Sequence, residues 1–283
     1  MAAAEGHESS GAYVLHHLTN LKLDLQTMTL NPEAKGFWVL NLDSVIFSLL
    51  LGSVVLVLFL KAARAATSGT PRGLLNFIET ALELAEKQVK EIYPHANPLV
   101  VPLALTIFMW VLFMNLMDVV PVDLMPWLAG KAGVDHLRIV PSTDVNITFG
   151  LSLSVFILII VYNVLFKGPA GFLKEVLTHP FGKWLAPVNL ILRIVEEIAR
   201  PVSLALRLFG NLFAGELIFV LIALLLAQAR TGVGGVFLAG GGFLANLLWT
   251  FFHMLVIPLQ AFVFAVLTVV YLSTAGTSHS EEH

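Results

Sequence analysis

The stretch PVSLALRLFGNLFAGELIF, residues 201–219, decides how this chain must be built. It lies inside a long apolar run, yet it carries Arg207, Asn211 and Glu216. A charged side chain at the centre of a membrane-spanning helix costs at least about 2.5–3.5 kcal/mol. Arginine cannot avoid this cost by losing its proton, because the pKa of a guanidinium lies above about 12. A permanent charge at position 207 therefore needs a compensating partner.

The composition is that of a membrane protein. Of the 283 residues, 57% are hydrophobic and only 12% are charged, and the mean hydropathy is +0.85. These values exclude an ordinary soluble domain. The net charge of −3, without a basic cluster, gives no indication of a nucleic-acid partner. The absence of cysteine excludes disulfides, thiol catalysis and Cys-ligated metals.

The hydropathy pattern predicts an all-α polytopic membrane protein with five membrane-embedded helices. The apolar segments, each long enough to cross about 30 Å of hydrocarbon, are residues 37–60, 98–120, 145–166, 188–229 and 243–272. Residues 1–36 are polar and form a predicted N-terminal segment outside the membrane, so that residues 37–283 are the membrane domain. Residues 74–92 place apolar side chains at helical spacing among charged ones. This pattern predicts an amphipathic helix on the membrane surface, with packing against a partner protein as the alternative.

Basic residues follow the first and third predicted spans. Lys61, Arg64 and Arg72 come after the first span, and Lys167 and Lys174 come after the third. The positive-inside rule places both of these ends in the cytoplasm. We therefore expect the N-terminus outside and the C-terminus in the cytoplasm.

The three arginines of the fourth apolar segment differ in their surroundings. Arg193, Arg200 and Arg207 are spaced by seven, so they share one helix face. The first two have Glu196 and Glu197 at neighbouring helical positions, which predicts local ion pairs. The structural interpretation of these four charges is a solvated helix end. The functional interpretation is a polar entrance from the cytoplasm.

Arg207 has no acidic neighbour one turn away. Glu216 lies about 13.5 Å further along the helix axis and on the opposite face. One interpretation is that Arg207 snorkels to the interface, which the apolar sequence on its C-terminal side disfavours. The alternative is a counter-charge from another helix or another chain.

The two long C-terminal segments can be aligned as an antiparallel hairpin. If Arg207 lies at the same membrane depth as Gln260, or Glu216 at the same depth as His253, the turn falls at about residue 234. This position is inside the Gly-rich stretch TGVGG at 231–235. The hairpin then carries two polar layers. One holds Arg207 and Gln260 with Asn211, and the other holds Glu216 and His253.

The layer of Glu216 and His253 has two interpretations. Both side chains can titrate near neutral pH, so the pair can serve as a proton relay. The alternative is a static buried ion pair or hydrogen bond, and the spacing does not decide between them. Asp118, at the outer end of the second span, either extends the relay or faces water.

Several long motifs resemble subunit a of bacterial F-type ATP synthases. They are PVSLALRLFGNLFAGELIFVLIA and FFHMLVIPLQAFVFAVLTVVYLS in the hairpin, PLALTIFMWVLFMNLMDVVPVDLMP at 102–126, VPSTDVNIT at 140–148 and KGPAGFLKEV at 167–176. The resemblance implies a non-catalytic stator subunit that carries protons through two offset half-channels to and from the carboxylates of the c-ring. It further implies partners in the c-ring proteolipids, the peripheral-stalk b subunits, the rest of the synthase and membrane lipid. The implied location is the bacterial inner membrane, and neither a cofactor nor a metal is implied.

The resemblance also assigns roles to single residues. Arg207 matches the stator arginine that faces the c-ring carboxylate. The polar positions that match the c-ring interface and the proton pathway are Asn211, Glu216, His253 and Gln260, with Asp118 and Ser203 as further members of the pathway. Arg193 departs from the family pattern, since many bacterial relatives have Glu there. The acidic group of the inner half-channel is therefore expected at Glu196 or Glu197.

Overall fold

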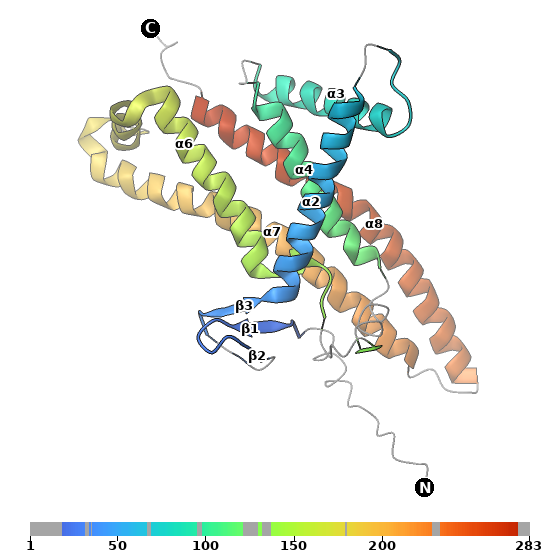
Figure 1. Ribbon diagram of the computed structural model, residues 1–283. Helices are drawn as coiled ribbons and strands as arrows, with labels where there is room; N and C mark the ends of the chain where they lie inside the picture. The colour runs from blue at the N-terminus through green and yellow to red at the C-terminus, as the bar shows by residue number, and fades with distance from the viewer. Residues whose placement is uncertain are drawn as a thin grey trace. The chain divides into compact units, whose positions relative to one another are not determined.

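The computed structural model describes residues 19–31, 34, 36–66, 69–94, 98–120, 130–131, 137–178, 180–227 and 233–276. Most of these residues are helical (Figure 1). The helices are α2 (Leu42–Ala65), α3 (Leu74–Ile92), α4 (Val100–Leu116), α6 (Val145–Thr178), α7 (Ala186–Ala227) and α8 (Val233–Gly276). Short 3-10 turns at Met117–Val119, Pro141–Thr143 and Lys183–Leu185 end α4 or precede α6 and α7.

Five of these helices are long and apolar enough to cross a membrane. Among the described residues the candidate spans are Leu42–Ala65, Val100–Val119, Val145–Thr178, Ala186–Ala227 and Gly234–Ala275. The predicted all-α polytopic membrane fold is therefore confirmed. Only a minority of each span's most apolar window is buried within the chain, as expected of helices whose outer faces meet lipid or other subunits.

The chain divides into two compact units, which we describe separately. Unit 1 comprises Met1–Gly52, Leu112–Asp144 and Gly210–Pro258, and unit 2 comprises Ser53–Val111, Val145–Phe209 and Leu259–His283. Unit 1 contains a small antiparallel sheet in the order β2-β1-β3, built from Lys22–Asp24 (β1), Thr29–Leu30 (β2) and Val39–Asn41 (β3). Because β3 takes up residues 39–41, the first span begins at Leu42 and not at the predicted residue 37.

The amphipathic helix α3 belongs to unit 2. Its bounds, Leu74–Ile92, coincide with those of the predicted amphipathic segment. Part of its apolar face turns toward α4 and α8, with which it lines a small apolar cavity of about 90 Å³. Val89 is buried on this face, and Lys90 pairs with Glu86 on the exposed side.

The C-terminal helices extend further than the hydropathy pattern predicted. Helix α8 begins at Val233, whereas the predicted start is Phe243, and so it includes Gly240, Gly241 and Gly242. Glycine costs about 1 kcal/mol per residue in a helix in water. In an apolar medium, however, an unpaired backbone group costs several kcal/mol, so the helix continues through the glycines. The predicted turn at 231–235 lies partly on residues outside the described ranges.

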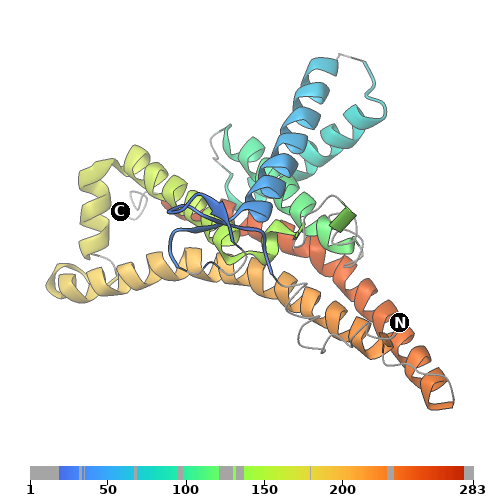
Figure 2. The same ribbon diagram turned by 60° about the horizontal axis from the view of Figure 1, so that its bottom comes forward.

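Near this turn α7 and α8 lie side by side in both views (Figures 1 and 2). A Cβ added to Gly242 would lie 2.6 Å from Cδ2 of Leu226. A side chain at position 242 would therefore require the Leu226 side chain to move.

Helix α6 contains a sharp kink after its apolar part. Gly168 has φ 68° and ψ 160°, and Pro169 follows it. This backbone region is essentially restricted to glycine, and other residues held in it cost about 1–3 kcal/mol. Lys167, just before the kink, pairs with Glu175 beyond it across 2.8 Å, which joins the two limbs of the helix.

We expect Gly168→Ala to lower the stability of the protein by about 1–3 kcal/mol, because alanine does not adopt this backbone conformation without strain. Gly150→Ala is the matched control: Gly150 lies in the regular part of α6, and a Cβ there meets no atom within 4 Å. The control should be neutral or stabilising by up to about 1 kcal/mol. Thermal unfolding of the purified complex compares the two variants, and equal melting temperatures would contradict the expectation.

Candidate functional site

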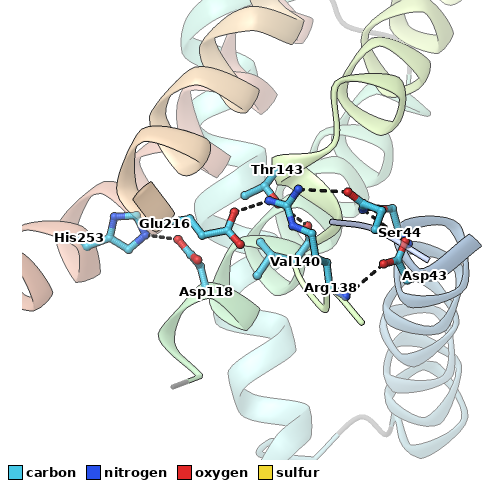
Figure 3. Close-up of polar contacts among 9 residues, drawn as sticks. Asp43, Ser44, Asp118, Arg138, Val140, Thr143, Glu216 and His253 are labelled. Carbon is cyan, nitrogen blue, oxygen red and sulfur yellow. Dashed lines mark hydrogen bonds and ion pairs between the residues drawn. The ribbon is translucent and has the colours of Figure 1, made fainter. Parts of the chain in front are cut away.

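Two pairs of buried polar residues lie in unit 1 (Figure 3). Glu216 of α7 forms an ion pair with Nη2 of Arg138, which precedes α6. His253 of α8 is hydrogen-bonded through Nε2 to Oδ2 of Asp118 at 2.5 Å. All four side chains are less than a tenth exposed. Removing one partner from a buried ion pair typically costs about 3–5 kcal/mol, so each pair ties its elements together.

Arg138 is surrounded by acceptors from three parts of the chain. Its Nη2 also donates to Oγ1 of Thr143 at 2.9 Å, and its Nη1 donates to Oδ1 of Asn20 at 3.2 Å. Its backbone N–H donates to Oδ2 of Asp43 at 3.0 Å. Figure 3 shows the guanidinium between Glu216 on one side and the first turn of α2 on the other.

The His253 ring fits against α7 because position 215 is glycine. A Cβ at Gly215 would lie 2.3 Å from Cε1 of His253. Trp249, one turn before His253, donates from Nε1 to the carbonyl of Gly215 at 3.3 Å. Phe219 meets the imidazole edge to face at a centroid distance of 5.5 Å. These contacts agree with the predicted hairpin register, which levels residues 216 and 253.

The pair of Asp118 and His253 opens onto a cavity of about 330 Å³. Its lining includes polar groups of α8 at helical spacing, Asn246, Thr250 and His253. The rest of the wall comes from the end of α4 and from α7, through Asp118, Val119, Val120, Phe219, Ile222, Ala223 and Leu226, and from Met254 of α8. The volume holds several water molecules, and the polar groups provide partners for them.

We expect Gly215→Ala to push His253 away from α7 and to weaken its hydrogen bond to Asp118. Overpacking of this kind costs about 1–3 kcal/mol. Gly240→Ala is the control, since a Cβ at Gly240 meets no atom within 4 Å. Thermal unfolding of the purified complex measures the loss; a Gly215→Ala variant as stable as the Gly240→Ala variant would show that the ring moves aside freely.

The charges of the first half of α7 neutralise one another, as the spacing predicts. Arg193 pairs with Glu197 at 2.8 Å, and Arg200 pairs with Glu196 and, at 3.5 Å, with Glu197. The guanidinium of Arg200 also lies 5.4 Å from the ring centre of Tyr271 on α8. The side chain of Glu196 is 53% exposed, whereas that of Glu197 is 15% exposed. The predicted local cluster is thus confirmed.

Arg207 has different surroundings. It is exposed on α7, and in the described part of the chain it makes no hydrogen bond or ion pair. Ser203 and Asn211, one turn before and after it, are exposed as well, so the three residues follow one face of the helix. Gln260, predicted to lie in the same layer, is buried on α8. The compensation of Arg207 must come from outside these described contacts.

The structure differs from the predicted pairing of Glu216 with His253. No hydrogen bond or ion pair joins these two side chains in the ranges that the structure describes: Glu216 binds Arg138, and His253 binds Asp118. Asp118 is buried and lines the cavity. The two pairs still lie next to each other (Figure 3), so the polar layer exists with four members in place of two.

Sequence reasoning missed Arg138. It stands in the loop before α6, outside the predicted spans. The available signal was an imbalance of charge, because Asp118 and Glu216 are acidic residues in or next to apolar segments and have no cation one helical turn away. Among the described residues no group of three or more His, Asp or Glu side chains has the geometry of a metal site.

The fold and the site together define a class of protein. Five apolar helices carry a permanent cation on an exposed helix face and a buried network of titratable side chains that opens onto a polar cavity. Intramembrane charges of this kind mark routes for ions and protons. The chain is thus a multi-pass membrane protein equipped for ion transport.

Comparison with known proteins places it in a family. The model of the family described as ATP synthase A chain matches residues 45–273. ATP synthase subunit a of Halorhodospira halophila is 50% identical over 277 residues, which cover 98% of this chain and 100% of that relative. The same subunit of Thiobacillus denitrificans is 49% identical, with 99% and 100% covered, and that of Shewanella frigidimarina is 48% identical, with 99% and 100% covered. The chain belongs to the ATP synthase A chain family, as the motifs indicated.

Proposed function

We propose that this chain is the stator channel subunit of a rotary F-type ATP synthase. It carries protons through two offset half-channels to and from the carboxylates of a c-ring, and so couples the proton gradient to rotation and ATP synthesis. The observation that carries this proposal is Arg207, an exposed cation on an apolar helix without a partner among the described residues. A passing carboxylate of a rotor subunit supplies the missing charge.

The physical basis is the different charge preference of a carboxylate in lipid and beside a guanidinium. Desolvation in lipid favours the neutral, protonated form, and a nearby cation favours the ionised form. Rotation past Arg207 therefore requires release of a proton on one side and uptake of a proton on the other. Each proton that crosses the membrane supplies about 2.3 kcal/mol per 100 mV. Arg207 stays charged throughout and blocks a direct proton leak.

The outer half-channel is formed by the network of unit 1. The cavity next to Asp118 and His253 supports entry of water, and Glu216 lies beside this pair. Asn211 and Gln260 are the further polar groups of this pathway. A proton passes from His253 and Asp118 to Glu216, and from there to the rotor.

The inner half-channel runs along the first half of α7. Glu196, Glu197 and Ser203 are its candidate groups. Many relatives carry Glu at the position of Arg193. In this chain the positive charge of Arg193 is balanced by its ion pair with Glu197.

The remaining features of the proposal follow from the same role. The chain lies in the bacterial inner membrane with its N-terminus outside and its C-terminus in the cytoplasm. It binds the c-ring and the b subunits of the peripheral stalk, and it contributes no catalytic group to ATP chemistry.

Arg207→Ala should abolish ATP-driven proton pumping in inverted membrane vesicles, because the rotor carboxylate then loses its counter-charge. Arg64→Ala is the control for loss of an arginine, since Arg64 is exposed at the end of α2. ATP hydrolysis and subunit content of the same vesicles establish that the complex is assembled. Coupled pumping by an assembled Arg207→Ala complex would refute the proposed function.

Asp118→Asn and His253→Ala should each slow pumping, because the two side chains share one hydrogen bond. The double variant should be no slower than the slower single variant, since residues that act as one unit are not additive. Initial rates of pumping, normalised to hydrolysis, give the three effects. If both single variants pump at the rate of the unmodified protein, there is no relay at this pair. If the effects of the two substitutions multiply in the double variant, the two residues act independently and not as one unit.

A further inference from the structure

Unit 1 buries more acidic groups than permanent cations. In its described part, four carboxylates are buried, those of Asp43, Asp118, Asp144 and Glu216, whereas Arg138 is the one buried arginine or lysine. An ionised carboxylate in a buried site needs compensation. It therefore matters which of the four carboxylates the charge of Arg138 compensates.

Asp43 does not need the charge of Arg138. Its Oδ2 accepts from the backbone N–H groups of Leu21 at 2.9 Å and Arg138 at 3.0 Å. Its Oδ1 accepts from the N–H of Ser44 at 2.8 Å and from Nδ2 of Asn20 at 3.3 Å. It also stands in the first turn of α2, where the helix dipole favours a negative charge. Neutral donors thus compensate Asp43.

The guanidinium of Arg138 forms a buried ion pair with Glu216. Its hydrogen bonds to Asn20 and Thr143 go to neutral oxygens. Asp118, the other acidic group near Glu216, has His253 as its partner.

Asn20 holds the far side of Arg138 and is itself held in one orientation. Its Oδ1 accepts from Nη1 of Arg138, while its Nδ2 donates to the side chains of Asp43 and, at 3.1 Å, Ser44. An amide flip would turn a donor toward the guanidinium and an acceptor toward a carboxylate. Asn20 is buried, and it lies just before β1, outside the first span.

We propose that Asn20 is a positioning residue that aims Arg138 at Glu216, so that the polar segment before the first span controls how readily Glu216 takes up and releases its proton. This inference rests on the proposed function of Glu216 in the outer half-channel. Arg138 keeps Glu216 available as a carboxylate that accepts a proton and passes it on.

The sign of the expected effect follows from the groups that face Glu216. These are Arg138, which favours the ionised form, and Asp118, which disfavours it when it is ionised, with Thr143 as a neutral neighbour. Seen from Glu216, His253 lies on the far side of Asp118, and Asp43 lies on the far side of Arg138 (Figure 3). When Arg138 is displaced, Glu216 loses the positive charge beside it. The acidic limb of the pH profile of proton pumping should then move to higher pH.

The test compares pH profiles of ATP-driven pumping in inverted vesicles for Asn20→Ala, Asn20→Asp and Thr27→Ala. Asn20→Asp should shift the acidic limb by about one pH unit, because its carboxylate attracts Arg138 away from Glu216 and lies beside Asp43. Asn20→Ala should give a smaller shift in the same direction. Thr27→Ala is the matched control in the same segment, since Thr27 is exposed and its hydroxyl bonds to Thr29, and it should leave the profile unchanged.

A second pair of variants decides the question if the Asn20 variants do not assemble. Arg138→Gln removes the charge and should shift the acidic limb, whereas Arg138→Lys keeps the charge and should shift it less. Unchanged profiles for assembled Asn20 variants, or equal profiles for Arg138→Gln and Arg138→Lys, would overturn the inference. Arg207→Ala, measured beside them, separates this failure from failure of the proposed function, because only the latter predicts coupled pumping without Arg207.

Discussion

The constraint on which this structure depends is that a charge within an apolar helix must be compensated. Glu216 and Arg138 compensate each other, and so do the arginines and glutamates of the first half of α7. Arg207 stands apart, because it is exposed and has no ion pair in the part of the chain that the structure describes. An isolated cation on an apolar helix is costly, which is the physical reason for proposing an acidic partner for Arg207. The membership in the ATP synthase A chain family agrees with such an assembly.

The buried pairs depend on close approach of the two C-terminal helices. Gly215 leaves room for the His253 ring, and Gly242 leaves room for Leu226. A larger side chain at position 215 or 242 would displace the His253 ring or the Leu226 side chain. Gly215 and Gly242 therefore serve packing between the helices, whereas a Cβ at Gly240 or Gly241 meets no atom within 4 Å.

The polar segment before the first span is part of the site and not only an appendage. Its strands pair with one another, and the residues at its two ends contact the network: Asn20 binds Arg138, and Asn41 donates to Asp144 at 2.8 Å. Each of these contacts joins residues that are more than 100 positions apart in the sequence. The network thereby couples several helices of unit 1 through polar contacts.

The sequence by itself determined the number of spanning helices, the amphipathic helix over residues 74–92, the local ion pairs around Glu196 and Glu197, and the unusual status of Arg207. These features depend on hydropathy and on helical spacing, which act over a few turns and are visible in the order of residues. The hairpin register also followed from the sequence, since polar groups at equal depth restrict how two helices align. Only the tertiary structure decided the partners of Glu216 and His253. Arg138 reaches Glu216 across 78 positions and Asp118 reaches His253 across 135, and contacts between such distant segments depend on how loops and strands fold back, which no local period encodes.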